Sequence, residues 1–204
     1  MIDERTIKVI GPRDPRVLGA VNTCSWANDW QRGLSPMILG PTTLTDGRRA
    51  ARMENSWQFA KVYPEHADPQ GNPTQEYWDW SRKGMASGRG VRYPMGKGRK
   101  PLYSLLGNEH LGYVEARKRI YFPPYRDAVR QSPAWTRLKE IFAQQGSIVL
   151  WDFDGYNRRD QSLHQVLNTP NRICGHAMVL AMTLAYGEDI TPETLPCHSN
   201  NALL

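Results

Sequence analysis

Apolar and polar residues alternate along several short stretches of the chain, and this pattern predicts strands. Residues 6–10 alternate and favour a first strand, and residues 17–24 favour a second, short one. The apolar run that opens residues 147–156 predicts a buried strand that leads into a turn. Residues 37–49 are expected to form a strand, a turn at Asp46-Gly47 and a further strand.

Elsewhere the apolar residues recur three and four positions apart, which predicts helices. The predicted helices cover 53–62, 111–120, 127–144 and 172–186, with a turn or two of helix around 163–167.

Proline and glycine set the expected helix ends. Pro64 stops the first helix, because proline lacks the backbone N–H that a helix interior needs. The proline-containing run 121–125 breaks the second helix. Ser132-Pro133 divides the third and supplies a cap, and Gly146 ends it.

These elements predict an α+β fold, mostly helical, in a single domain that spans residues 1–204. We expect an enlarged, irregular insertion at about 65–100 and a polar, partly disordered tail from about 188 to 204. The segment from Arg82 to Lys100 has seven basic residues and no acidic one. It is either a solvated insertion or a mobile basic lid over a phosphate or a nucleic-acid backbone.

The chain carries a net charge of +6, which permits a polyanionic partner but does not require one. No apolar run approaches the roughly 18–20 residues of a membrane span. Because the N-terminus also lacks a signal-peptide pattern, a cytoplasmic location and no membrane association are expected.

The three cysteines are odd in number and far apart, which excludes a disulfide framework. Cys174 and His176 can be drawn as a zinc site with Cys197 and His198, but these spacings are unlike those of common zinc sites. Buried thiols and ordinary histidines are therefore favoured, and neither a metal nor a cofactor is expected.

One predicted helix carries polar residues where a core stripe is usual. Glu54, Trp57, Gln58 and Lys61 are spaced i, i+3, i+4 and i+7, so they share one face of the helix 53–62. A carboxylate, an indole, an amide and an ammonium on one face indicate either a solvated surface or the wall of a polar pocket.

Two further carboxylates, Asp152 and Asp154, follow the apolar strand. If both residues belong to the strand, they are two positions apart, so their side chains point to the same side of the strand. Both carboxylates can then serve one site. The alternative is that they cap the turn before Gly155. Carboxylates in surroundings rich in Trp and Tyr suit cleavage of a glycosidic bond, whose transition state resembles an oxocarbenium ion. The Walker, G-x-G-x-x-G, G-x-S-x-G and H-E-x-x-H motifs are absent.

The polar stripe fits a family signature, E-x-x-[FW]-Q-x-x-K, which reads Glu54-Asn-Ser-Trp57-Gln58-Phe-Ala-Lys61 here. Further family elements occur in the same order: Val21-Asn22-Thr23-Cys24-Ser25, Leu34-Ser35-Pro36, Asp46-Gly47, Trp151-Asp-Phe-Asp154-Gly155 and Asn171-Arg-Ile-Cys-Gly175-His-Ala-Met178. Over residues 20–186 the chain therefore resembles the NADAR or YbiA-like proteins, as a divergent member. It departs from their pattern at Pro36, at Asp152 and in the spacing from Asn171 to Gly175.

The resemblance implies a YbiA-like α+β domain that acts as an N-glycosidase on an ADP-ribosylated or ribosylated nucleobase. It implies that Glu54 is the catalytic acid/base or nucleophile, with Asp152 or Asp154 as the second carboxylate. The substrate-binding residues expected with them are Trp57, Gln58, Lys61, Trp151, Asn171, Ser35 and Arg49. Lys61 would contact phosphate or orient Glu54, and Asn171 would contact the ligand from a helix N-terminus.

The expected partner is a nucleotide or ADP-ribosyl small molecule, or a modified nucleic acid. Two other functions remain open. One is a non-catalytic nucleotide or nucleic-acid binder, based on the basic segment with Trp78, Trp80, Tyr93 and Tyr103 nearby in the sequence. The other is a glycosyl or ADP-ribosyl transferase that uses the same pocket.

Overall fold

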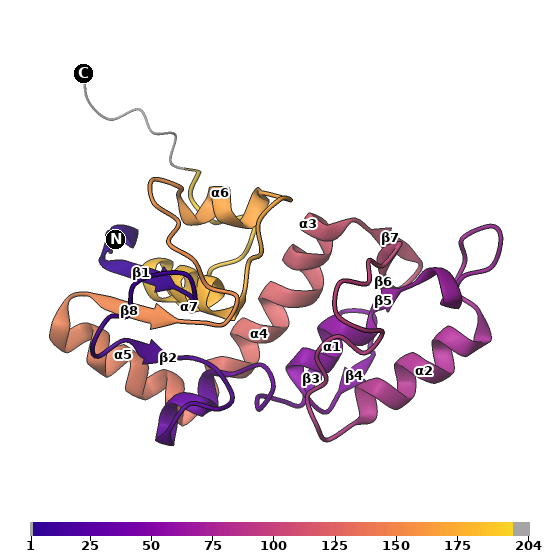
Figure 1. Ribbon diagram of the computed structural model, residues 1–204, viewed down its shortest axis with the longest axis horizontal. Helices are drawn as coiled ribbons and strands as arrows, with labels where there is room; N and C mark the ends of the chain where they lie inside the picture. The colour runs from indigo at the N-terminus through magenta and orange to yellow at the C-terminus, as the bar shows by residue number, and fades with distance from the viewer. Residues whose placement is uncertain (1, 198–204) are drawn as a thin grey trace. The chain divides into compact units, whose positions relative to one another are not determined.

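The computed structural model describes residues 2–197 (Figure 1). The chain divides into two compact units, Met1–Leu34 with Arg130–Leu204, and Ser35–Val129, which are taken in turn below. About 40% of the residues are helical and 13% lie in strands, so the predicted α+β class is confirmed. That the whole chain is one domain stays a prediction.

The first unit is built on a parallel sheet in the order β1-β8-β2. Its strands are β1 (Ile7–Ile10), β2 (Val21–Asn22) and β8 (Ile148–Trp151). The predictions of strands at 6–10 and after 147 are confirmed, whereas the strand predicted at 17–24 is reduced to two residues. β8 lies in the centre with Val9 and Val21 both opposite Leu150, so segments from both ends of the chain form one sheet.

Helices pack against this sheet and bury it. α7 (His176–Tyr186) contacts β1 and β8, and α5 (Pro133–Gln145) contacts β8. From His176 to Ala185 every residue of α7 is buried, which fits a helix that is apolar all round. α5 begins with Ser132 as its cap and ends at Gly146 in the left-handed conformation, as predicted.

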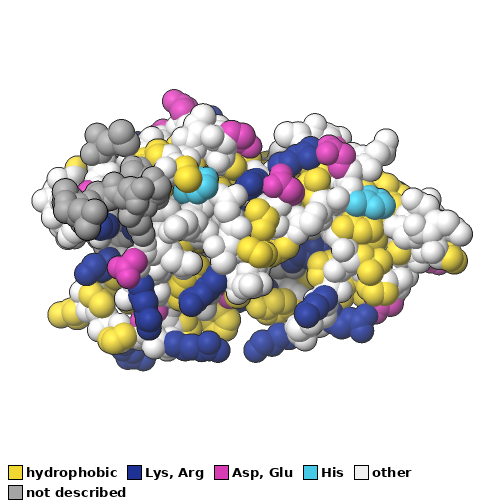
Figure 2. Space-filling model, turned by 90° about the horizontal axis from the view of Figure 1, so that it is seen from above, with side chains coloured by type: hydrophobic (Ala, Val, Ile, Leu, Met, Phe, Trp, Pro, Cys, Tyr) yellow, Lys and Arg dark blue, Asp and Glu magenta, His cyan; other side chains and the backbone are white. Residues whose placement is uncertain are grey.

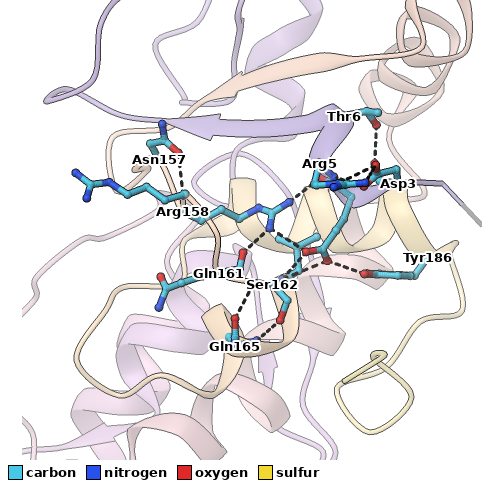
Figure 3. Close-up of polar contacts among 12 residues, drawn as sticks. Asp3, Arg5, Thr6, Asn157, Arg158, Gln161, Ser162, Gln165 and Tyr186 are labelled. Atoms are coloured by element: carbon cyan, nitrogen blue, oxygen red, sulfur yellow. Dashed lines mark hydrogen bonds and ion pairs between the residues drawn. The ribbon is translucent and has the colours of Figure 1, made fainter. Parts of the chain in front are cut away.

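A polar network attaches the N-terminal segment to the end of the chain (Figure 3). Within η1 (Glu4–Thr6), the Glu4 carboxylate accepts hydrogen bonds from Arg158 Nη1 (2.9 Å) and from the Tyr186 hydroxyl (2.6 Å). Arg158 also donates to the backbone carbonyl of Glu4. Ser162 and Gln165 form a capping box at the start of α6 (Leu163–Asn168), which confirms the helix expected there.

One expectation for the C-terminal part is wrong. α7 begins at His176 rather than near Arg172, because residues 171–175 form an irregular connection that ends at the helix cap Gly175. Within the tail expected to be polar and partly disordered, Ile190 and Leu195 are buried. Residues 198–204, including His198 of the zinc site considered above, lie outside the described residues.

The second unit contains an antiparallel sheet and a hairpin. The sheet has the order β5-β6-β7 and the hairpin pairs β3 with β4. The strands are β3 (Thr42–Thr43), β4 (Arg49–Ala50), β5 (Lys61–Val62), β6 (Tyr103–Leu106) and β7 (Glu109–Leu111). The predicted Asp46-Gly47 turn joins the hairpin. The strand predicted at Met37 is wrong, because the N–H groups of Ile38 and Leu39 both donate to the Ser35 carbonyl in a turn.

α1 (Met53–Phe59) lies at the centre of the second unit, where it contacts α2 (Gln75–Ala86), α4 (Phe122–Val129) and the β3-β4 hairpin. It is shorter than predicted, since Lys61 and Val62 belong to β5. Its last carbonyls are bound from outside the helix: the Ser81 hydroxyl donates to Phe59 O (2.7 Å), and Leu105 N donates to Ala60 O (2.8 Å). These bonds end α1 before Pro64 is reached.

The stretch 65–100 is more regular than predicted, because it contains η3 (Pro64–His66) at its start and the long helix α2. Thr74 caps α2 by accepting from Tyr77 N. Gly84 is part of this helix rather than of a flexible loop. It lies against the Phe59 ring so closely that a Cβ there would be 2.0 Å from a ring carbon. Its small size allows α2 to pack on α1.

The predicted break at 121–125 is also wrong. Helical structure continues from α3 (Tyr113–Ala116) through the π-helical turn η4 (Arg117–Tyr121) into α4. Pro123 and Pro124 lack the N–H groups that would bond to the preceding turn, and the wider π turn directly before them accommodates this loss. No helix within residues 2–197 has the length and apolar character needed to cross a membrane.

The contact between Gly84 and Phe59 predicts that Gly84→Ala destabilises the protein, although alanine normally favours a helix by up to about 1 kcal/mol. The added methyl group must displace a buried ring, which costs about 1–3 kcal/mol. Urea unfolding of the variant and the wild type measures the difference in the free energy of unfolding. Gly88→Ala is the control, since a Cβ there meets open space. Equal stability of Gly84→Ala and the wild type would contradict this packing.

Candidate functional site

Glu54 lies in the first turn of α1, with 7% of its surface exposed. Its backbone N–H donates to the Pro36 carbonyl (3.0 Å), and its Oε1 accepts from Gln58 Nε2 (2.7 Å), one helical turn further on. The predicted spacing of Glu54 and Gln58 thus produces a direct contact. The carboxylate is buried and bound by an amide, which excludes a solvated surface for this part of the helix.

Lys61 joins the same group of side chains from β5. Its Nζ donates to Gln58 Oε1 (2.8 Å) and lies 4.6 Å from the centre of the Trp57 ring. Gln58 therefore connects the carboxylate of Glu54 to the ammonium of Lys61. The sequence predicted that the four side chains share a face of one helix. In the structure, three come from α1 and Lys61 comes from the strand that follows it, and they still meet.

The ammonium of Lys61 is electrostatically perturbed. Burial lowers the pKa of Lys61 from its ordinary 10.5 to about 8, an effect that the Glu54 carboxylate partly opposes and the Arg92 guanidinium increases. Because the folded pKa lies below the unfolded one, protonated Lys61 costs stability below pH 8. This cost decreases as the pH rises from about 8 towards 10.5. Perturbed groups of this kind are typical of functional sites.

Aromatic rings form one side of the group. The Trp57 ring lies 5.2 Å from that of Tyr121 and 6.1 Å from that of Tyr113, and Tyr121 stacks in parallel on Tyr125 (6.2 Å). Trp57 is partly exposed and Tyr113 is 44% exposed, so flat apolar surface remains accessible beside the charged groups. Such surfaces can stack on a nucleobase.

The other expected binding residues of the second unit behave differently. Ser35 is buried, and its hydroxyl accepts from Met37 N (3.3 Å), so it shapes the turn that leads into the hairpin. Arg49 is exposed on β4, where its backbone pairs with Thr43. Neither has a described contact with the Glu54 group, and their roles in binding stay predictions.

Asp152 follows the end of β8 and is 2% exposed. Its Oδ1 accepts from Asp154 N (3.2 Å), and its backbone carbonyl accepts from Gly155 N (2.9 Å). Because β8 ends at Trp151, Asp152 and Asp154 lie in the turn that follows and not in the strand. That both carboxylates serve one site stays a prediction. Asp152 forms the turn, as the alternative proposed, and Asp154 is partly exposed.

No sequence pattern indicates the residues that surround the Asp152 carboxylate. Its Oδ2 lies 3.3 Å from His176 Nδ1, and its Oδ1 accepts from Cys24 Sγ (3.9 Å). His176 Nε2 lies 2.8 Å from the Thr23 carbonyl, and a Cβ on Gly175 would meet Asp152 Oδ2 at 2.5 Å. Asp152 thus connects the end of β8 to the start of α7, a contact between positions 24 residues apart.

The remaining residues expected in the site lie near this turn or in the connection before α7. Trp151, the last residue of β8, is partly exposed and packs edge to face with Trp26 (6.3 Å). Asn171 is exposed in an irregular segment, so its predicted place at a helix N-terminus is wrong, because α7 starts at His176.

Of the expected residues, Glu54, Trp57, Gln58 and Lys61 form a group in the second unit, whereas Trp151 and Asp152 lie at the end of β8 in the first unit. That a carboxylate of the first unit meets Glu54 stays a prediction. Within residues 2–197, no three His, Cys, Asp or Glu side chains are gathered as metal ligands. Comparisons with protein-family models, curated proteins and solved structures find no match to this chain.

The surroundings of Lys61 predict an unusual titration. We expect Lys61 to lose its proton near pH 8 and Glu54→Gln to lower this pKa further, because the carboxylate stabilises the ammonium. Nuclear magnetic resonance of ¹³C-labelled lysine side chains between pH 6 and 11 measures both values. An unchanged or higher pKa in the Glu54→Gln protein, or a wild-type pKa near 10.5, would contradict the described geometry. Lys97, which is exposed, serves as an internal reference.

Proposed function

We propose that this protein is an N-glycosidase of the NADAR or YbiA-like type. It would hydrolyse the bond between a ribosyl C1′ carbon and a nucleobase nitrogen, in an ADP-ribosylated or ribosylated substrate. The observation that carries this proposal is the buried Glu54 carboxylate, which Gln58 connects to Lys61 beside the ring of Trp57. The four residues are those of the family signature that the sequence resembles.

The chemistry of the group supports this reaction. As the bond to the nucleobase breaks, positive charge develops on the ribosyl ring, and a carboxylate can stabilise it or accept a proton from the attacking water. Gln58 holds Glu54 in place through the hydrogen bond to its Oε1. Water supplies the new hydroxyl group at C1′, and the remaining proton of that water molecule is transferred to the nitrogen of the leaving base.

The surrounding groups support the class of substrate. The Trp57 and Tyr113 rings offer surface on which a flat base can stack. Lys61, with a pKa of about 8, remains mostly protonated at neutral pH and can hold a phosphate. The reaction needs water and no cofactor, and a cytoplasmic location would suit a nucleotide-type substrate.

The proposal predicts that Glu54→Gln lowers the turnover number by about 10²–10⁴, the usual contribution of a catalytic acid or base. The fold should persist, because the new amide has the same shape and its oxygen still accepts from Gln58. Chromatography of the products from ADP-ribosylated guanosine measures release of free ADP-ribose and base. Adding alcohol or amine acceptors separates hydrolysis from transfer.

Glu115→Gln is the matched control for this experiment, since Glu115 is an exposed residue of α3 with an ion pair to Lys118. It should leave both turnover and stability unchanged. Full activity of the Glu54→Gln protein on every substrate that the wild type cleaves would refute the assignment of Glu54. A change of the circular dichroism spectrum in that variant would instead show that Glu54 is needed for folding.

A further inference from the structure

A pocket of about 550 Å³ lies within the first unit, between one face of α5, the end of α7 and the N-terminal segment. Trp135, Lys139 and Phe142 are spaced i, i+4 and i+7 along α5, so they line the pocket from the same face of that helix. The volume is within the range of about 300–1,000 Å³ that is usual for small-molecule sites. The described residues that line this pocket are separate from the Glu54 group of the second unit.

The pocket reaches side chains of the core and is more than an apolar surface patch. Hydrophobic side chains occur at several places on the face of the molecule drawn in Figure 2, and exposed apolar atoms are normal on folded proteins. By contrast, Trp135 and Leu184, which both line the pocket, are only 1% and 7% exposed. Gly146 and Gly187, which end α5 and α7, border it, and a Cβ on either would meet no other part of the chain within 4 Å. The space beside these two helix ends is therefore open.

One ion pair supplies polar groups to this apolar pocket. Glu188 Oε1 accepts hydrogen bonds from Lys139 Nζ and from Trp135 Nε1 (2.8 Å). The bonds from Lys139 and Trp135 hold the pKa of Glu188 below its usual value, so the carboxylate is ionised at neutral pH. Within residues 2–197, no hydrogen bond reaches Glu188 Oε2, and the Lys139 ammonium has further protons to donate. The pocket therefore offers one acceptor and one donor side by side.

The other charged groups near the pocket are also paired. Asp3, the second carboxylate in its lining, accepts from Arg5 Nε (2.9 Å). Arg130, whose charge acts on Glu188, lies 3.6 Å from a carboxylate oxygen of Asp189. Each cation is thus matched by an anion, and no excess charge of either sign remains to attract an ionic ligand.

We propose that this pocket binds a small neutral molecule that has a flat apolar ring and a terminal amide. The ring would lie against the apolar interior, where Trp135 and Phe142 supply aromatic surface. The amide N–H would donate to Glu188 Oε2, and the amide oxygen would accept from Lys139 Nζ. A carboxylate in the same place would meet the charge of Glu188, and an ammonium would meet that of Lys139, so both ionic ends are disfavoured. This inference is independent of the proposed hydrolysis.

Calorimetric titration of the full chain with naphthylacetamide, naphthylacetate and naphthylethylamine tests the proposal. The three probes share the same ring system and differ in a neutral, an anionic or a cationic end. The amide should bind at least about tenfold more tightly than either charged probe, because like charges placed opposite each other are costly. Failure of the amide to bind, equal binding of all three, or tightest binding of a charged probe would overturn the proposal.

The location of the site is tested by filling the pocket. Ala143 lines it from α5 at an exposed position, so Ala143→Trp should weaken amide binding by at least about tenfold without unfolding the chain. Gln144→Trp, a change at the next, exposed position of α5 outside the lining, is the matched control and should bind as the wild type does. Wild-type binding by the Ala143→Trp protein would refute this location. A dimer in sedimentation that only Ala143→Trp dissociates would assign the pocket to a second copy of the chain and also overturn the proposal.

The role of the ion pair is tested by selectivity, which a loss of stability alone does not change. Glu188→Gln leaves Lys139 without its anion, so the ratio of acetate to amide affinity should rise about tenfold. Lys139→Gln leaves the Glu188 carboxylate without its cation, and the ratio of amine to amide affinity should rise by a similar factor. Parallel weakening of all three probes in both variants would show that the pair supports only the fold, and the proposed recognition of the amide would fail.

Discussion

The second unit depends on the burial of polar side chains along α1, each of which must find a hydrogen-bond partner. Ser56 shares a hydrogen bond with Thr42 of the hairpin (2.5 Å), Asn55 binds the segment after α2, and Gln58 binds both Glu54 and Lys61. An apolar helix could pack here in many orientations about its axis and at several distances from its neighbours. A helix whose buried face is polar fits in few ways, because any shift leaves donors and acceptors unpaired. The hairpin, the basic segment and β5 are therefore fixed by the same seven-residue helix.

This constraint also has an electrostatic consequence. Burial of Lys61 lowers its pKa from 10.5 to about 8, although the Glu54 carboxylate opposes this effect. The shift corresponds to roughly 3 kcal/mol of unfavourable free energy for the charged form. A core that only needed stability would have an uncharged residue there. The hydrogen bond to Gln58 and the Trp57 ring offset part of this cost.

The sequence predicts best where local signals determine the structure. Ser132-Pro133 and Gly146 delimit α5 as expected, since caps act within one turn of helix. Prediction from sequence fails where residues distant in the chain determine the structure. Hydrogen bonds from α2 and β6 end α1 earlier than predicted, and a π-helical turn allows the helix to continue through Pro123 and Pro124. For the site, helical spacing predicted the contact of Glu54 with Gln58. It did not predict Arg92, whose place depends on a hydrogen bond between residues 36 apart in the chain.

The Asn55 contacts also explain how part of the basic segment 82–100 is ordered. A loop rich in glycine and cations is normally mobile, because its charges repel and it buries little apolar surface. Here three backbone groups are bound by one buried amide, and Val91 adds apolar contact next to Trp57. The ordering of this part of the loop is therefore completed during folding rather than on binding.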